Sequence, residues 1–248
     1  MMSKLAVLSG TIPILNGPIF ARLEKSSPGD GSVEAEVFSG DDFLFISRHG
    51  RPGGDFTPPH LVNHLAHFQT LSELNVNEVI GIYSTGSLKA DLQPGTLVVP
   101  DDFICLYPTP TSVTDTPKHI TPVMDDGVRR DLIRAAHEVS APVRDGGVYW
   151  QTSGPRLETK AEIGLMAGTV DIVGMTLASE AVLAREFGMA FGALCSIDNY
   201  AHGVAGGTLD ELDIRVQAAR NAEIIGKIVS RYIENFRLRK PPIGRVLS

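Results

Sequence analysis

The chain has 248 residues, of which 43% are hydrophobic, and this is enough to bury the core of one large domain. Its formal net charge of −7 argues against nucleic acid as a main partner, because binding phosphate backbones requires clustered lysines and arginines. No run of 18 apolar residues and no signal-peptide pattern is visible, so we expect no membrane helix. Cys105 and Cys195 have neither metal-type nor disulfide-framework spacing, so we expect two buried thiols in a cytoplasmic protein.

Short apolar runs predict strands, and periodic apolar positions predict the helices between them. In chain order, we expect strands at 6–8, 43–46, 79–83, 96–100, 147–152, 172–175 and 191–197. We expect helices at 60–74, 127–140, 159–168, 178–187 and about 208–236, the last opened by a capping box of Thr208 and Glu211. Loops are expected at 51–59 and 107–122. This alternation predicts an α/β fold in one domain, residues 1–248, with a mixed central β-sheet flanked by helices on both faces.

Polar residues follow several of these strands, where the pockets of α/β proteins usually lie. The first cluster, Ser9-Gly10-Thr11, is suited to binding an anion but also makes an ordinary turn. Arg48-His49 follows the second strand, and its arginine fork suits either a phosphate or a surface carboxylate. Ser84-Thr85-Gly86-Ser87 predicts a third turn, in which Gly86 lets a flat ligand approach the backbone.

Two further residues of interest follow the strand at 172–175. Thr176 is a candidate phosphate donor, and Met175 suits an apolar sugar face as well as it suits a core. Glu180 lies in the first turn of the next predicted helix, where it either favours the helix dipole or accepts a sugar hydroxyl.

Glu158 lies in a Gly-Pro loop that follows a predicted strand. Its carboxylate is suited to accept the N1–H of a 6-oxopurine, whereas a 6-aminopurine has only a lone pair at N1. Asn199 complements it, because a carboxamide donates to N7 and O6 of the same base. A 6-aminopurine would be matched better by a protonated aspartate, and one residue of slip in the strand would turn Asp198 to that face.

Together these residues resemble the trimeric purine nucleoside phosphorylases, and most closely the methylthioadenosine and methylthioinosine phosphorylase branch. The similarity covers about residues 43–232 and depends on short motifs that are specific only in combination. They are Ser47-Arg48-His49-Gly50, Val62-Asn63, Gly86-Ser87-Leu88, Gln93-Pro94-Gly95, Gly154-Pro155-Arg156 with Glu158 and Ala161-Glu162, and Gly174-Met175-Thr176 with Glu180-Ala181.

The resemblance implies a homotrimeric enzyme of purine salvage that transfers a pentosyl group from a purine nucleoside to inorganic phosphate, without a metal or organic cofactor. By resemblance, phosphate is held by Thr11, Arg48, His49, Ser84 and Thr176. Base and ribose are then held by Thr85, Gly86, Leu157, Glu158, Met175 and Asn199, and His119 reaches the 5′ group across a subunit boundary. Glu158 and Asn199 hold the departing purine while phosphate attacks an oxocarbenium-like sugar, so catalysis is mainly positioning and electrostatic stabilisation.

The chain departs from that family pattern at the expected phosphate site. Ser9-Gly10-Thr11 stands where Gly-Gly-Thr is usual, Arg51-Pro52-Gly53-Gly54 replaces a second histidine, and Tyr83 stands where a small or hydroxyl residue is common. We therefore predict a phosphorylase of 6-oxopurine nucleosides, with S-methyl-5′-thioinosine as one candidate substrate. The alternatives are a methylthioadenosine phosphorylase that uses Asp198, a nucleosidase that uses water, and a non-catalytic purine-binding protein.

Overall fold

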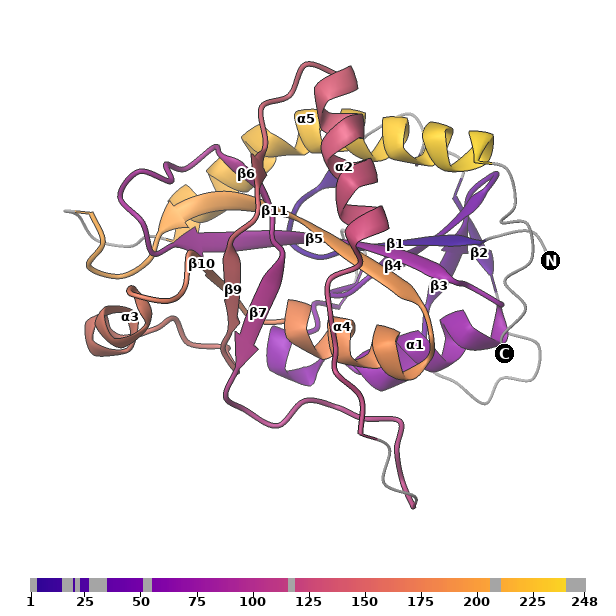
Figure 1. Ribbon diagram of the computed structural model, residues 1–248, viewed down its shortest axis with the longest axis horizontal. Coiled ribbons are helices and arrows are strands. Elements are labelled where there is room, and N and C mark those ends of the chain that lie inside the picture. Colours follow the sequence, from indigo (N-terminus) through magenta and orange to yellow (C-terminus); the bar gives the residue numbers. More distant parts are fainter. Residues whose placement is uncertain are drawn as a thin grey trace.

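The computed structural model describes residues 4–14, 20, 23–26, 35–50, 55–115, 119–205 and 211–239. Within these ranges, strands β1 to β11 form one sheet (Figure 1). They are β1 (Leu5–Ser9), β2 (Glu24–Ser26), β3 (Val37–Ser39), β4 (Phe43–Ser47), β5 (Glu78–Ser87), β6 (Leu97–Val99), β7 (Asp102–Cys105), β8 (Arg144–Asp145), β9 (Val148–Gln151), β10 (Ile172–Gly174) and β11 (Ala190–Tyr200). The helices are η3 (Pro59–Leu61), α1 (His64–Glu73), α2 (Asp126–Glu138), α3 (Lys160–Met166), α4 (Leu177–Glu186) and α5 (Glu211–Leu238).

The sheet is mixed, and its topology brings distant segments to one edge. Strands follow the order β2-β3-β4-β1-β5-β10-β9-β7, and β11 pairs with β5 and β6. Strands β4, β1, β5 and β11 are parallel to one another, so the residues that follow them leave the sheet at the same edge. Strand β10 runs antiparallel to β5, so the chain that leaves β10 heads toward the N-terminal end of β5.

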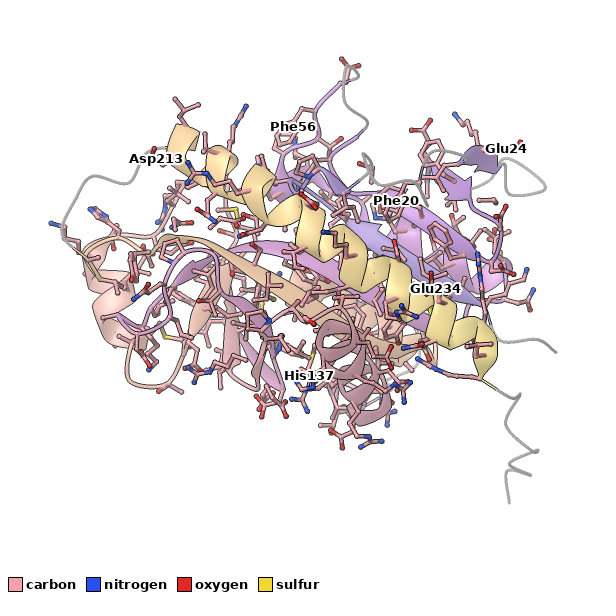
Figure 2. The ribbon with its side chains drawn as sticks, turned by 90° about the horizontal axis from the view of Figure 1, so that it is seen from above. Phe20, Glu24, Phe56, His137, Asp213 and Glu234 are labelled. Carbon is pink, nitrogen blue, oxygen red and sulfur yellow. The ribbon has the colours of Figure 1, made fainter. Side chains whose placement is uncertain are left out.

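Helices cover both faces of the sheet, as Figure 1 shows. Helices α2 and α5 pack on one face and α1 and α4 on the other, each pair over its own buried apolar cluster. In the view from above, α5 crosses the sheet diagonally from Asp213 past Glu234 (Figure 2). The predicted α/β architecture is confirmed, while the expectation of one domain stays a prediction. Within the described ranges, no helix combines the length and the apolarity that crossing a bilayer requires.

Several local predictions were wrong for identifiable reasons. Residues 84–87 are not a turn but the end of β5, because β11 pairs with them on one side and β10 with Ser87 and Gly86 on the other. Leu61 is 63% exposed, because it lies in η3, before α1 begins at the Asn63 cap. Cys195 is buried as expected, but Cys105 is only partly so. No sequence pattern predicted β2, β3, β7 or β8, and Thr208 of the expected capping box lies outside the described residues.

Gly192 allows α2 to approach β11 closely. A Cβ at this position would lie 2.5 Å from Val128 Cγ1 and 3.1 Å from Val128 Cβ. We expect Gly192→Ala to destabilise the protein by about 1–3 kcal/mol, the usual cost of overpacking a core, measured by denaturant unfolding. Gly164→Ala is the matched control, because a Cβ on this helical glycine would have no neighbour within 4 Å. A Gly192→Ala variant as stable as the control would contradict this packing.

Candidate functional site

Arg48 lies just beyond β4, at the shared edge of the sheet, and is 3% exposed. Its Nε and Nη2 form a fork on the Glu180 carboxylate, with 2.9 Å between Nη2 and Oε2. Nη2 also donates to the carbonyl of Leu8 at 3.2 Å, and Nη1 donates to the carbonyl of Ile82 at 2.7 Å. A guanidinium has five N–H groups, so the remaining one is on Nη1. Arg48 does pair with a carboxylate, but the carboxylate is buried rather than at the surface.

Glu180, in the first turn of α4, is fully buried and is held from several sides. Its Oε2 also accepts the O–H of Tyr83 at 2.6 Å, and His64 Nδ1 lies 3.3 Å from Oε1. Burial alone would raise the pKa of Glu180, but the charge of Arg48 and the hydrogen bonds from His64 and Arg48 together outweigh burial and hold this pKa well below its usual range. Burial likewise opposes the charge on Arg48, and Glu180 raises the pKa of Arg48 in spite of it. The carboxylate is therefore a partner of Arg48, and it is not available for a sugar hydroxyl.

His49 and Gly10 lie beside Nη1 of Arg48, which carries the remaining N–H. His49 Nδ1 is 2.8 Å from the carbonyl of Thr57, which can only accept, so Nδ1 carries the hydrogen and Nε2 of the neutral ring is an acceptor. Burial lowers the pKa of His49, which keeps the ring neutral at pH 7. A Cβ on Gly10 would lie 3.0 Å from His49 Nε2 and 3.4 Å from Arg48 Nη1. We call Gly10, Thr11, Arg48 and His49 the anion corner; Thr11 is exposed there, and residues 51–54 lie outside the described residues.

The remaining predicted phosphate and ribose residues lie in or next to β5 and α4, and the hydroxyl of Ser84 forms a hydrogen bond with Asp198. Thr176 is the N-cap residue of α4 and is buried, and half-buried Ser84 follows Tyr83 in β5. Both elements contact Arg48, through Glu180 and Tyr83. Met175 lies against the Gly-Pro loop, since a Cβ on Gly154 would meet its Sδ at 2.6 Å. Gly154 also has a φ of 59°, a conformation that favours glycine.

Glu158 is 7% exposed, although it lies in a loop. Thr152, which follows β9, donates its hydroxyl to Glu158 Oε1 at 2.7 Å. The backbone N–H of Thr152 in turn donates to the carbonyl of Gly174 at 2.9 Å, which attaches this loop to the end of β10. One carboxylate oxygen is thus held by the protein, and Oε2 has no hydrogen bond recorded among the described residues.

Asn199 lies in β11, which β5 and β10 separate from β9; it is opposite Gly86 of β5, which is in turn opposite Val173 of β10. A Cβ on Gly86 would lie 3.1 Å from Asn199 Nδ2 and 3.3 Å from Val173 Cγ1, so the absence of a side chain on Gly86 lets both residues approach the backbone of β5 closely. Nδ2 donates one hydrogen to the carbonyl of Tyr200 at 2.8 Å and retains the other. Asn199 and Glu158 therefore belong to the same four-strand segment of the sheet, β11-β5-β10-β9.

Asp198 turns away from Asn199, because the pairing of β11 with β5 shifts between Ile197 and Asn199 and leaves Asp198 as an extra residue. Its Oδ1 accepts from Ser196 Oγ at 2.6 Å and from Asn221 Nδ2 of α5 at 3.2 Å. Burial raises the pKa of Asp198, although the hydroxyls of Ser196 and Ser84 and the Asn221 amide oppose that shift. The carboxylate is therefore directed into the α5 side of the sheet.

Three predicted residues are less clearly placed. Thr85 is buried, and its hydroxyl donates to the carbonyl of Ser196 at 2.8 Å, so it supports β11. Leu157 is 44% exposed beside Glu158. His119 is exposed in the long loop, and no contact recorded for it reaches the anion corner.

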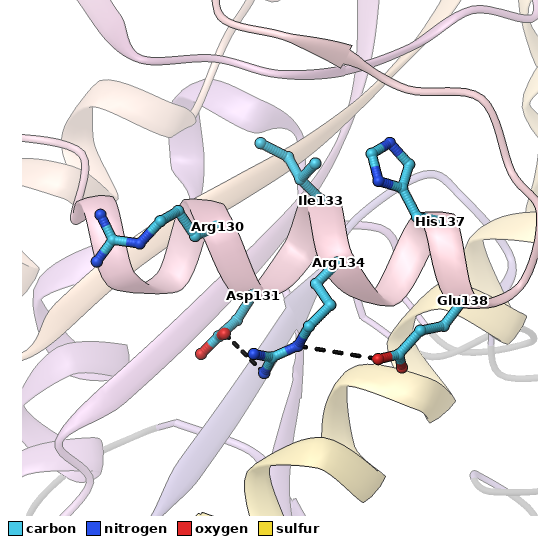
Figure 3. Close-up of a pocket in the computed structure, with 6 residues that line it drawn as sticks. All are labelled: Arg130, Asp131, Ile133, Arg134, His137 and Glu138. Carbon is cyan, nitrogen blue, oxygen red and sulfur yellow. Dashed lines mark ion pairs between the residues drawn. The ribbon is translucent and has the colours of Figure 1, made fainter.

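Sequence reasoning missed Tyr83, His64 and Thr152 as residues that organise the site. Tyr83 had a signal, since it departs from the family pattern, but its contact with Glu180 joins positions 97 residues apart. Two surface hollows contain none of the predicted site residues. One is formed by α2 alone, where Arg134 pairs with Asp131 and Glu138 (Figure 3). The other lies between α5 and residues 13–14.

Comparisons with known proteins agree with this geometry. The profile described as phosphorylase superfamily matches residues 32–234. The chain is 40% identical over 207 residues to the "Probable 6-oxopurine nucleoside phosphorylase" of Archaeoglobus fulgidus, covering 83% of this chain and 84% of that protein. It is also 40% identical over 204 residues to the "Probable S-methyl-5'-thioinosine phosphorylase" of Methanothermobacter thermautotrophicus, covering 78% of this chain and 71% of that protein.

Solved structures extend the likeness to the fold. A mutant adenosine/methylthioadenosine phosphorylase from Schistosoma mansoni, in complex with adenine, superposes with a TM-score of 0.81. The superposition covers 96% of this chain and 93% of that one, at 21% sequence identity. At this identity, the likeness supports the architecture and does not by itself assign a substrate.

Proposed function

The chain belongs to the phosphorylase superfamily, and we propose that it is a purine nucleoside phosphorylase acting on 6-oxopurine nucleosides. It transfers the pentosyl group from the purine to inorganic phosphate, and S-methyl-5′-thioinosine is a candidate substrate. The names of the two archaeal relatives support this proposal.

The observation that carries the base assignment is the polarity of two side chains on the β11-β5-β10-β9 segment of the sheet. Glu158 offers a carboxylate oxygen, and Asn199 offers an amide N–H. A 6-oxopurine presents the complementary groups, with a donor at N1 and acceptors at O6 and N7. As the glycosidic bond breaks, negative charge develops on the purine, and an N–H placed at N7 stabilises that charge more strongly than it stabilises the intact nucleoside.

The anion corner is the proposed phosphate site. The free N–H of Arg48, the hydroxyls of Thr11, Ser84 and Thr176, and the backbone near Gly10 would hold the anion. His49 Nε2 would accept a hydrogen bond from a protonated oxygen of the phosphate. Phosphate seated there stabilises the cationic sugar and then attacks C1′, which makes positioning the main contribution of the protein.

The geometry favours this proposal over its alternatives. A methylthioadenosine phosphorylase of the kind considered from the sequence needs Asp198 at the base, but the bulge in β11 directs Asp198 to Asn221. A nucleosidase or a non-catalytic binder would not need an anion site, whereas Arg48 keeps one N–H beside His49 and Gly10. We further propose a cytoplasmic homotrimer without a metal or organic cofactor, built on one domain, in which His119 serves a neighbouring subunit.

The direct test follows base release from inosine, methylthioinosine and methylthioadenosine, each with and without phosphate. The proposal predicts release that requires phosphate and favours the two 6-oxopurine nucleosides. Release at the same rate without phosphate would identify a nucleosidase. Faster turnover of methylthioadenosine would contradict the base assignment.

Asp198→Asn separates the two base assignments. Asn retains the oxygen that accepts from Ser196 and Asn221, so we expect kcat/KM for inosine and for methylthioadenosine to stay within about threefold of their wild-type values. If Asp198 faced the base, this substitution would selectively reduce activity on methylthioadenosine. Steady-state kinetics on both substrates decides between these outcomes.

A further inference from the structure

Two groups of the same composition lie in this fold, each an arginine, a buried glutamate and a buried tyrosine. At the anion corner, Tyr83 donates to Glu180, which is paired with Arg48. At the start of β5, Tyr232 donates to Glu78 Oε1 at 2.5 Å, and Arg239 donates to Glu78 Oε2 at 2.6 Å. The second group fastens α5 to the sheet and contains none of the proposed site residues. It therefore shows what such a group does when its role is only structural.

The first group is packed more tightly around its arginine. The guanidinium carbon of Arg48 lies 4.3 Å from the centre of the Tyr83 ring, and the Arg48 and Glu180 side chains are 1% and 0% exposed. The ring therefore fixes the tilt of the guanidinium, and the Tyr83 hydroxyl occupies one of the acceptor positions on Glu180 Oε2. Among the described residues, one N–H of Arg48, on Nη1 beside Gly10, has no acceptor recorded and is left for a ligand.

The Tyr83 hydroxyl has a specific consequence for that N–H. Without this donor, Glu180 Oε2 would be a buried carboxylate oxygen lacking one hydrogen bond, which is costly. The other donor recorded on Oε2 is Arg48 Nη2 at 2.9 Å, whereas His64 Nδ1 lies 3.3 Å from the other oxygen, Oε1. The guanidinium would turn to satisfy the carboxylate, and the N–H at the anion corner would be withdrawn from its ligand.

We propose that Tyr83 is a positioning residue for phosphate, which acts by satisfying Glu180 so that Arg48 keeps one N–H directed at the anion corner. The assignment deepens the proposed function and depends on it. The chain brings the ring to this place because Tyr83 folds back over Gly81, where any Cβ would collide with the tyrosine side chain.

The test is Tyr83→Phe, which keeps the ring under Arg48 and removes only the hydroxyl. We expect the Kd for inorganic phosphate, measured by calorimetry without nucleoside, to rise about tenfold, as loss of one hydrogen bond to a charged group predicts. The KM for phosphate should rise in parallel. The KM for nucleoside at saturating phosphate should stay within about twofold, since no base contact is altered.

Tyr232→Phe is the matched control, because it removes a tyrosine–glutamate hydrogen bond of the same kind. It should lower the Tm without changing the Kd for phosphate. A phosphate Kd in Tyr83→Phe within twofold of wild type, or an equal rise in Tyr232→Phe, would overturn the assignment. If Tyr83→Phe fails to fold, Glu180→Asp provides the same readout, because its shorter carboxylate cannot reach both Arg48 and Tyr83, and an unchanged Kd would again overturn it.

The two proposals fail in different ways. Wild-type protein that releases base without phosphate and gives no heat with phosphate would overturn the proposed function and, with it, the role of Tyr83. A wild-type enzyme that requires phosphate, combined with an unaffected Tyr83→Phe variant, would overturn the role of Tyr83 alone.

Discussion

Glu158→Gln should lower kcat/KM for 6-oxopurine nucleosides about 100-fold, the effect of losing a charged hydrogen bond and leaving a donor unpaired. Thr152 makes the expected effect large. Its hydroxyl donates to Oε1 of Glu158, so in the variant it holds the oxygen of the new amide and leaves the NH₂ group toward the base. The amide would then meet the N1–H of a 6-oxopurine with a second donor, whereas it would match the N1 lone pair of a 6-aminopurine.

The ratio of activities on the two base types is the measurement, because it cancels any general loss of active protein. The ratio of methylthioadenosine to methylthioinosine turnover should rise in Glu158→Gln. Glu162→Gln is the control, since Glu162 lies four residues further along and caps α3 through the backbone N–H of Thr159 at 2.7 Å. Equal losses on both base types in Glu158→Gln would contradict the proposed N1–H contact.

Glu180→Leu should destabilise the protein by about 3–5 kcal/mol, the usual cost of removing one partner of a buried ion pair. The variant leaves the Arg48 charge buried at 3% exposure, with two carbonyl groups as its remaining acceptors. Denaturant unfolding measures the change. The double variant Arg48→Met with Glu180→Leu should lose less stability than Glu180→Leu alone, because it removes the unpaired charge.

A surface pair provides the contrast. Glu223 pairs with Lys227 at 2.7 Å, but their side chains are 80% and 58% exposed. Glu223→Gln should therefore leave the free energy of unfolding nearly unchanged. A Glu180→Leu variant as mildly affected as Glu223→Gln would show that Arg48 is not held as described.

The same pair predicts a dependence of stability on pH. Burial opposes the shift, but the charge of Arg48 and the hydrogen bonds from His64 and Arg48 together hold the pKa of Glu180 below its ordinary value in the folded protein. A group with a depressed folded pKa contributes stability that is fully present above the unfolded carboxyl value of about 4.3 and is lost as the pH falls through the folded value. Wild type should lose this contribution in acid, and Glu180→Leu should show a flatter acid limb.

Local sequence patterns predicted the helices and strands well where the apolar pattern of a segment agrees with its pairing in the sheet. The strands before Thr11, Arg48 and Asn199 could be located because their apolar runs are clear, and parallel pairing brings their ends to one edge. The turn predicted at 84–87 was wrong, because hydroxyls and glycine typical of turns are kept in β5 by strands on both sides. Tertiary pairing overrides local preference in such cases.

The partners of Arg48 were beyond the reach of local patterns. The sequence indicated an arginine suited to phosphate, but the fork of Arg48 on Glu180 joins positions 132 residues apart. The two roles considered for Glu180, favouring the helix dipole or accepting a sugar hydroxyl, did not include its contacts with Arg48 and Tyr83. The facing of Asp198 and Asn199 could not be settled either, because it depends on one bulge in β11. The assignment of Glu158 to the base was made from the chemistry of a carboxylate in this loop, and it stays a prediction.

The most direct test of the base assignment is a crystal structure of the protein with hypoxanthine and phosphate. The account predicts that Glu158 accepts from N1 of the base, that Asn199 donates to N7 or O6, and that the anion lies beside Arg48, His49 and Gly10. A base bound to Asp198 instead, or a Glu158 side chain that makes no contact with it, would contradict the account.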